Sequence, residues 1–283
     1  MGTIVFAKRR LRSFFLGALC LSLPLPLPAQ VPAAQSVEAV PAVNIDGQNG
    51  DWPGSKLVLD SKSGAEIAFR NDGRVLHVLF IVKKPEPRVS LQSTGLMVLA
   101  RKEGSKASRG VLFLKRTVPA ETYIRWREVQ GDLLKEEEKA KLRGALQHDL
   151  CFAFAVGAGG SIYGPLRRLP GSEPPESAVS EAASETIYEL KIPLLSPNLV
   201  PGGLGVTPGE NFRISFEWGG TSRSVLSPKT TEAASPLDQR ADVSGSGVTW
   251  GQEYLDSFDS LSRPAKGTKK FSFAIDVRLA EPK

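Results

Sequence analysis

Groups able to perform acid–base or nucleophilic chemistry are few in this sequence. Its 283 residues include two histidines, His77 and His148. His77 alternates with apolar residues in the run 75–82, where a histidine is more often a satisfied core residue than a base, and His148 follows a helix-forming stretch. No Gly-x-Ser-x-Gly elbow, His-Glu-x-x-His pair or phosphate-cradling glycine loop occurs. Scattered carboxylates neither establish nor exclude the pair that glycoside hydrolysis needs. The sequence therefore predicts no enzyme.

The N-terminal segment has the pattern of a secretory signal peptide. Four basic residues precede the apolar run 13–23: Lys8, Arg9, Arg10 and Arg12. Prolines interrupt the residues that follow, so the apolar run is too short for a membrane-spanning helix of about 20 residues. We expect residues 1–29 to be removed, with cleavage near Ala29, or near Ala33 or Ala34. The mature chain would then be periplasmic or extracellular, with no transmembrane segment.

Charge and cysteine content also change when this leader is removed. The net charge of +6 falls to +2, because the leader carries four basic residues and no acidic one. The basic pI therefore gives no support for nucleic-acid binding, which needs a clustered basic face. Cys20 lies inside the leader, and Leu19 precedes it where lipoproteins have Gly, Ala or Ser, so we do not expect a lipid anchor. Cys151 remains as a single thiol, without an internal disulfide, and is expected to pack as a small apolar residue.

Alternating and β-branched patterns predict a fold made mainly of strands. The most secure element is a hairpin of strands 65–70 and 75–82, joined by the turn Asn71-Asp72-Gly73-Arg74, with its second strand buried on both faces. Residues 211–218 and 270–279 alternate apolar and polar side chains, as in a sheet with one face on a core and one in water. Further strands are expected at 56–60, 95–100, 110–115, 150–156 and 186–192.

One helix and three irregular stretches complete the expected organisation. Strong helix formers fill 132–147, the one predicted helix. Residues 30–43 are expected to be a flexible lead-in, and 157–184 and the loop Thr221 to Lys269 to be irregular. Many strands with one helical excursion favour a mainly β, antiparallel, jelly-roll-like β-sandwich over βαβ units. We predict one such domain over 44–283.

Two separated signatures resemble those of the carbohydrate-binding module family 9 domain. The first is Ile45-Asp46-Gly47 followed by Asp51-Trp52, and the second is Tyr188-x-x-x-Ile192-Pro193-Leu194, followed by a Pro-Gly turn into a strand. The resemblance covers roughly residues 43–280 and implies a DOMON-like β-sandwich. It implies structural roles for Asp46, Gly47, Asp51, Trp52, Ile192 and Pro193, with Gly47 permitting a tight turn and Trp52 burying its ring.

The resemblance also implies a structural calcium ion, since members of the family often hold one. Asp46, Asn49 and Asp51 are the oxygen donors near the first signature. Calcium takes about six to eight oxygens, so three in one short loop fall short of a site. The alternative is that Asp46 and Asp51 cap the turn.

The sugar sites of the family are aromatic, because the apolar face of a sugar packs on an indole or phenol ring. Trp52 belongs to the first signature, and Trp218 is expected in the core beside residues 212–216. Trp126 alternates with Ile124 and is expected either to pack in a strand or to form an exposed platform between Arg125 and Arg127. Trp250 lies in the Ser- and Gly-rich loop, with no apolar periodicity to bury it, and is the best candidate platform. The alternative is that Trp250 anchors its loop to the core.

One strand departs from the family pattern. Where sugar-binding members carry an acidic strand after the hairpin, Thr94 to Arg101 has no carboxylate, so the fold follows from the resemblance more directly than the sugar does. Domains similar to the family also bind haem through Met and His, for which Met97 with His77 or His148 would be the pair. We expect an exported, non-catalytic domain that binds a polysaccharide or oligosaccharide as an accessory to its breakdown. The alternative is an envelope interaction domain with a protein partner and no sugar.

Overall fold

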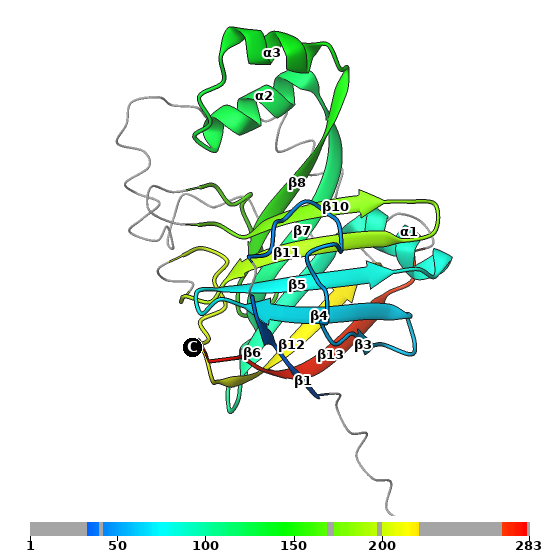
Figure 1. The fold of residues 1–283 in the computed structure, drawn as a ribbon, viewed down its shortest axis with the longest axis vertical. Helices are drawn as coiled ribbons and strands as arrows, with labels where there is room; N and C mark the ends of the chain where they lie inside the picture. The colour runs from blue at the N-terminus through cyan, green and yellow to red at the C-terminus, as the bar shows by residue number, and fades with distance from the viewer. Residues whose placement is uncertain (1–32, 40–41, 169–172, 197–199, 221–267, 282–283) are drawn as a thin grey trace, which may run out of the picture. The chain divides into compact units, whose positions relative to one another are not determined.

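The computed structural model describes residues 33–39, 42–168, 173–196, 200–220 and 268–281 (Figure 1). The chain divides into two units, Met1–Gln30 and Val31–Lys283, and all described residues belong to the second. The predicted leader, Cys20 and Trp250 lie outside the described residues, as does most of the loop Thr221 to Lys269. Among the described residues, no helix is both long and apolar enough to cross a membrane.

Two sheets account for the strands of the described residues. Sheet A has seven strands in the order β1-β13-β12-β6-β7-β8-β9, and sheet B has the order β10-β11-β5-β4-β2, with β3 also paired to β4. The strands of sheet A are β1 (Ala33–Gln35), β13 (Phe271–Arg278), β12 (Asn211–Trp218), β6 (Leu96–Lys102), β7 (Arg109–Pro119), β8 (Gln147–Val156) and β9 (Ile162–Tyr163). Those of sheet B are β10 (Glu176–Glu181), β11 (Thr186–Pro193), β5 (Val75–Val82), β4 (Ala65–Asn71), β3 (Val58–Leu59) and β2 (Val37–Glu38). The predicted β-sandwich is confirmed.

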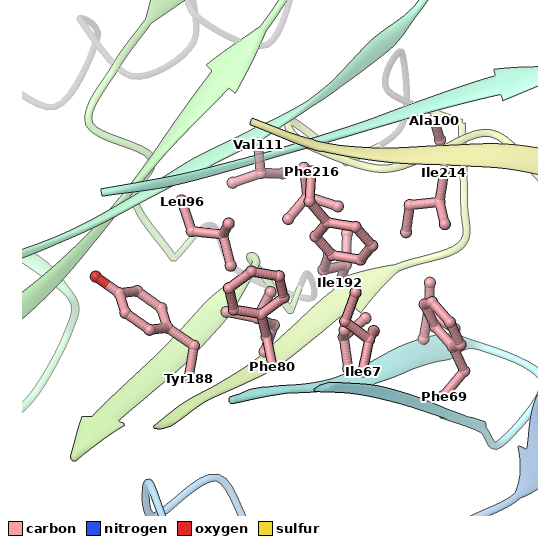
Figure 2. Close-up of a cluster of buried hydrophobic side chains, with 14 of the residues drawn as sticks. Ile67, Phe69, Phe80, Leu96, Ala100, Val111, Tyr188, Ile192, Ile214 and Phe216 are labelled. Atoms are coloured by element: carbon pink, nitrogen blue, oxygen red, sulfur yellow. The ribbon is translucent and has the colours of Figure 1, made fainter. Parts of the chain in front are cut away.

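The core lies between the sheets because alternate side chains of each strand point inward. The predicted hairpin forms as β4 and β5, and every residue of β5 is buried. In β12 and β13 the apolar residues are buried and their polar neighbours face outward, as the alternation predicts. Figure 2 shows Phe80 and Ile67 of sheet B meeting Phe216 and Leu96 of sheet A. The rings of Phe80 and Phe216 stack with centroids 5.3 Å apart.

Helices are more numerous than predicted. The described residues contain α1 (Pro85–Thr94), α2 (Ala120–Val129) and α3 (Glu136–Arg143). The predicted helix 132–147 is shorter than expected, and its last residue, Gln147, begins β8. Helix α1 starts with proline in its first turn, where the missing N–H costs no hydrogen bond. Helices α2 and α3 lie together at the far end of the long strands β7 and β8 (Figure 1).

Two stretches predicted to be irregular contain strands. The lead-in forms β1, which runs parallel to β13 in sheet A, and β2, which runs parallel to β4 in sheet B. Ser36 lies between them and donates from Oγ to Asn71 Oδ1 at 2.5 Å, and the same Asn71 oxygen accepts the N–H of Ala280 at 3.1 Å. Residues 33–39 of the lead-in therefore form a strap that joins both sheets. Likewise, residues 157–184 supply the edge strands β9 and β10.

Candidate functional site

The first signature lies on the outer face of sheet B, away from the core between the sheets. Trp52 is 6% exposed and packs against Ala68 of β4, Leu79 and Ile81 of β5 and Ile187 of β11. These four residues occupy the strand positions that point away from the core, so the indole covers an apolar patch that would otherwise face water. Trp52 thus occupies a buried, packed position.

A buried carboxylate, Glu189 of β11, joins the two signatures. Its Oε2 accepts the backbone N–H groups of Asp46 at 3.0 Å, Gly47 at 2.8 Å and Gln48 at 3.2 Å. Its Oε1 accepts the indole N–H of Trp52 at 2.7 Å. Gly47 has a φ of +82°, and an added Cβ would lie 3.2 Å from the backbone nitrogen of Ser180, so a tight glycine turn presents these donors. We call Glu189 and these four donors the Glu189 hub.

Burial and hydrogen bonding act in opposite directions on Glu189. Its side chain is fully buried, and this desolvation raises the pKa of the carboxyl above its ordinary value. The indole and the backbone N–H groups oppose that rise because all of them donate to the ionised form. Three successive N–H groups that converge on one oxygen form an anion-binding concavity, here occupied by the chain's own side chain.

The carboxylates of the first signature cap its turns. Asp46 Oδ1 accepts the N–H of Gln48 at 2.8 Å, and Asp51 Oδ2 accepts the N–H of Asn44 at 3.0 Å. Asn49 contributes its backbone oxygen to the N–H of Trp52 at 3.2 Å. Within the described part of the chain, no three His, Cys, Asp or Glu side chains gather as metal ligands. The contacts of Asp46 and Asp51 are those of the capping alternative.

Arg70 fixes the rest of the loop to sheet B. Its guanidinium donates to Ser55 Oγ at 2.9 Å and to the backbone oxygens of Asp51 at 2.9 Å and Pro53 at 2.8 Å. The guanidinium carbon also lies 5.6 Å from the centroid of the Trp52 ring. Arg70 is only 3% exposed, so its role is to hold the loop rather than to meet a ligand.

Arg70 begins a row of polar residues that crosses the outer face of sheet B. The strand register pairs Arg70 with His77, His77 with Lys191, and Lys191 with Glu176. We call these four residues the polar row. His77 is 5% exposed, and its Nδ1 has no hydrogen-bond partner among the described residues. Its Nε2 lies 3.9 Å from Asp72 Oδ2, and burial lowers the pKa of the imidazole.

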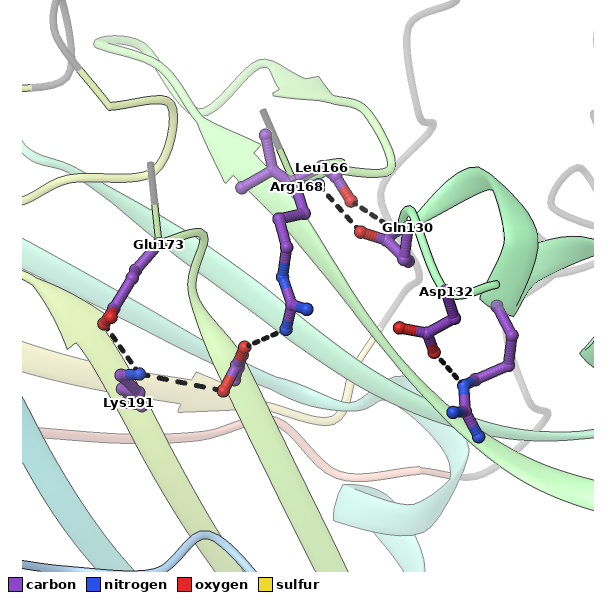
Figure 3. A network of polar contacts seen from close by, with 8 residues as sticks. Gln130, Asp132, Leu166, Arg168, Glu173 and Lys191 are labelled. Carbon is purple, nitrogen blue, oxygen red and sulfur yellow. Dashed lines mark hydrogen bonds and ion pairs between the residues drawn. The ribbon is translucent and has the colours of Figure 1, made fainter. Parts of the chain in front are cut away.

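The solvent-exposed end of the row continues into a network of charged side chains. Lys191 Nζ lies 2.8 Å from Glu173 Oε2, and Glu176 accepts from Arg168 at 3.0 Å (Figure 3). The backbone N–H of Arg168 donates to Gln130 Oε1 at 2.7 Å, which connects this network to the end of α2. Half of the Arg168 side chain is exposed, so its guanidinium is within reach of a ligand from solvent.

Three of the predicted ligand residues, Trp126, Arg125 and Arg127, do not form an exposed platform. Trp126 lies on α2 rather than on a strand, is 6% exposed and packs edge-on against Phe152 with ring centroids 4.9 Å apart. Arg127 pairs with Asp132 and lies over the Tyr123 ring, whereas Arg125 is exposed. No open indole face remains between the two arginines. Trp250, the other predicted platform, lies outside the described residues.

Ile192 and Trp218 lie in the core, whereas Pro193 ends a strand and Cys151 is half-buried. Ile192 contributes to the core between the sheets, and Pro193 pairs with Val75 at the end of β11. Trp218 is 3% exposed, and its indole donates to the backbone oxygen of Pro87 at 3.0 Å. Cys151 is half-buried, and burial raises the pKa of its thiol, which favours the unreactive form.

The pairs considered for haem are too far apart. Met97 belongs to the outer face of sheet A, whereas His77 lies on the outer face of sheet B. Met97 is in register with Leu112 and, through it, with Phe154, which is six residues from His148 along β8. Six strand residues span about 20 Å, too far for ligands of a single iron. His148 Nε2 instead lies 2.8 Å from the backbone oxygen of Leu142.

Three site residues were not singled out by the sequence patterns: Glu189, Arg70 and Tyr163. Glu189 stood within the second signature without an assigned role, and its outward position opposite inward-facing Tyr188 and Leu190 was its only signal. Tyr163 on β9 is 45% exposed and is the exposed large aromatic side chain of the described residues. An added Cβ on Gly157 would lie 3.0 Å from Tyr163 Cε2, so the ring packs closely against the backbone there.

No family model and no curated protein sequence matches this chain. Among solved structures it is similar to a carbohydrate binding module family 9 domain from Caldicellulosiruptor kristjanssonii in complex with glucose. The two chains share 10% sequence identity with a TM-score of 0.38, over 89% of this chain and 97% of that chain. A cellotriose complex from the same organism matches with 10% identity and a TM-score of 0.37, over 88% and 95%. Likeness at this level adds nothing to what the residues themselves indicate.

Proposed function

We propose that the chain is an exported, non-catalytic carbohydrate-binding domain of the family 9 type that assists polysaccharide breakdown. The observation that carries the proposal is the Glu189 hub. The two signatures on which the sequence resemblance rests are more than a hundred residues apart, yet one buried carboxylate joins them through four hydrogen bonds. This joining supports the view that the signatures belong to one structural unit rather than to chance similarity.

The ligand platform is expected on a surface aromatic outside this hub. Trp52 and Trp126 are buried, so neither offers a ring face to a sugar. Among the described residues, the exposed aromatic ring is that of Tyr163. Trp250 remains the candidate outside them. A ring that is held by its backbone contact and open on its other side suits packing against the C–H face of a sugar.

Polar groups for the sugar hydroxyls are available nearby along the chain. Arg168 follows Tyr163 by five residues. Between them, the backbone N–H of Leu166 donates to the backbone oxygen of Ala153 in β8. Arg168, Glu173 and Glu176 carry planar donor and acceptor groups and are partly exposed. Sugar hydroxyls both donate and accept, so mixed charges serve them better than a single sign would. These groups would replace the carboxylates missing between Thr94 and Arg101.

Binding to a panel of soluble and insoluble polysaccharides tests this proposal. We expect the chain from Gln30 onward to bind at least one glycan, and Tyr163→Ala or Trp250→Ala to reduce that binding about tenfold or more. One stacked ring contributes up to about 1.5 kcal/mol, and about 1.4 kcal/mol corresponds to a tenfold change in affinity. Addition of a chelator is expected to leave binding unchanged, because the carboxylates of Asp46 and Asp51 already accept backbone N–H groups.

Two controls separate lost binding from lost folding. Val89→Ala removes an exposed apolar side chain of α1 and should leave both binding and stability unchanged. Each platform variant should keep the unfolding temperature of the unaltered chain, since its ring contributes to no core cluster or lies in the loop. If a well-folded chain binds no glycan in the panel, the proposal is wrong.

A second candidate is an envelope interaction domain on the same fold. The observation that favours it is the helical excursion, where Leu133 is 96% exposed and Leu146 is 88% exposed. Both leucines flank α3, whose residues include none that is buried. Under this alternative the leucines are contact residues for a protein partner. Charged replacements at Leu133 and Leu146 would then abolish binding of that partner, whereas Tyr163→Ala and Trp250→Ala would leave it unchanged.

A further inference from the structure

His77 occupies an unusual place in the polar row. Its cross-strand neighbours on the outer face are Arg70 of β4 and Lys191 of β11, so a cation stands on each side of it. The ring is 5% exposed, and Nδ1 lacks a partner within the described part of the chain. A buried imidazole with an unsatisfied nitrogen is costly to keep, which is the reason to ask what it does.

The charged groups that face His77 come from every element around it. Asp72, in the turn after β4, places its carboxylate 3.9 Å from Nε2, and its side chain is 47% exposed. Glu189 is the diagonal neighbour on β11, but its oxygens already accept four hydrogen bonds in the Glu189 hub. Glu173 and Glu176 both lie near Lys191 rather than near the imidazole. A proton on His77 would therefore add a third positive charge to the row, with a half-exposed carboxylate to offset it.

We propose that His77 is an acid-sensitive element. When it becomes protonated, it loosens from sheet B the loop of residues 44–55, which carries the first signature. The mechanical connection is Arg70, which lies beside His77 and holds the loop through Ser55, Asp51 and Pro53. Repulsion between the imidazolium and the guanidinium acts on these contacts directly. The loop also carries the donors of the Glu189 hub, so its release would expose the hub to water. This inference does not depend on glycan binding.

The sign of the pH dependence follows from the lowered pKa of His77. Desolvation by burial is the largest cause that lowers the pKa of His77, with Lys191 and Arg70 adding to it and Asp72 opposing it. The unfolded or opened state therefore binds the proton more readily than the closed state. The contribution of neutral His77 to the stability of the closed loop is fully present above the ordinary histidine pKa of about 6.5. It is lost progressively as pH falls below that value.

Proton NMR of the whole chain tests the first part, because the sequence contains only two histidines. His148→Gln identifies the remaining imidazole signals as those of His77. We expect His77 to titrate below pH 6.5, and Lys191→Met to raise its pKa because one neighbouring cation is removed. Titration of His77 at or above 6.5, or an unchanged pKa in Lys191→Met, overturns the proposal.

Hydrogen exchange at the amides of Asp46, Gly47 and Gln48 tests the second part. After correction for intrinsic exchange, we expect protection of these amides to fall severalfold between pH 7 and pH 5. The fall should be at most half as large in His77→Gln, which keeps a polar side chain and cannot be protonated in this range. Any change that Glu189 contributes by its own titration is common to both proteins. An equal loss of protection in the two proteins overturns the proposal, even if His77 titrates as expected.

Discussion

The two outer faces of the sandwich are covered in different ways. On sheet A, Trp126 of α2 lies over Phe152, Phe154 and other apolar residues of β6, β7 and β8, and contacts between apolar side chains form the cluster. On sheet B, a loop without regular structure lies over β4, β5 and β11 and is held by a buried carboxylate and a buried guanidinium. Apolar packing covers the outer face of sheet A. On the outer face of sheet B, hydrogen bonds to buried charged groups hold the loop that carries the packed indole of Trp52.

This difference predicts how each face responds to substitution. Apolar packing tolerates another apolar side chain of similar size, because dispersion and burial have little directionality. A buried carboxylate that satisfies four donors has no apolar substitute, because each donor left without a partner costs its own desolvation. The outer face of sheet B should accordingly be the less tolerant of the two, and four substitutions test this from the largest effect to the smallest.

Glu189→Ala should destabilise the protein most, by about 4 kcal/mol or more in free energy of unfolding. The substitution leaves the buried N–H groups of Gly47 and Trp52 and the part-buried N–H groups of Asp46 and Gln48 without their acceptor. Hydrogen bonds to a charged group contribute about 1 kcal/mol or more each. Urea denaturation measures this as a lower midpoint at an unchanged slope. Glu66→Gln, which removes a carboxylate from the pair with Lys83 on the same face, is the control and should cost less than about 1 kcal/mol. Equal midpoints for the two variants would contradict the role of the Glu189 hub.

Trp126→Ala should cost about 3 kcal/mol, because it empties the centre of the apolar cluster on sheet A. Trp126→Leu should recover at least half of that loss, since the site requires apolar volume and no particular hydrogen bond. The comparison with sheet B is sharpened by Glu189→Leu, which should recover nothing relative to Glu189→Ala. Calorimetric unfolding temperatures of the four variants provide the measurement, and recovery at both sites would remove the distinction between the faces.

Asn71→Ala should cost about 2 kcal/mol by releasing the strap formed by the lead-in. The Asn71 side chain accepts from Ser36 and from Ala280 and donates to the backbone oxygen of Ala280 at 3.0 Å. Loss of these bonds releases Ser36, between β1 and β2, from Asn71 of β4 and separates Asn71 from Ala280, which follows β13. Limited proteolysis should then cut first near residues 33–39 in the variant. If cleavage in that segment is equally fast in the unaltered chain, the strap is not held as described.

Arg168→Ala should have the smallest effect, below about 1 kcal/mol, because its pair with Glu176 is largely solvated. The same substitution should weaken glycan binding if the charged network of Arg168, Glu173, Glu176 and Lys191 contacts the sugar. Thermal unfolding and binding to the glycan bound by the unaltered chain are measured on one preparation. A loss of stability like that of Glu189→Ala would show that this network is structural rather than available to a ligand.

The sequence predicts the parts of the fold whose signal is local. Strand β5 is a largely apolar run rich in β-branched residues, and β12 and β13 alternate with period two. Each is therefore found within one or two residues of its observed bounds. Helix α2 is missed because Ile124 and Trp126 alternate as in a strand, while its neighbours have no apolar stripe. Contact with Phe152 on β8 buries Trp126 in spite of that weak pattern, and the sequence alone does not contain this contact.

The site is less predictable because its parts come from distant segments. The first signature identifies the loop and its turn-capping carboxylates, but Glu189 acts across more than a hundred residues of chain. A glutamate in an outward strand position normally faces solvent, and only the loop that crosses it makes it buried. The strap was missed for the same reason, since the two residues of β2 acquire strand geometry from β4 rather than from their own propensity.

Binding measured by isothermal titration calorimetry, after a polysaccharide panel has identified a soluble glycan, tests the proposed function most directly. The account predicts saturable binding by the unaltered chain, and binding at least about tenfold weaker in Tyr163→Ala or Trp250→Ala at an unchanged unfolding temperature. A folded chain that binds no glycan, or binding that survives both substitutions together, would contradict it.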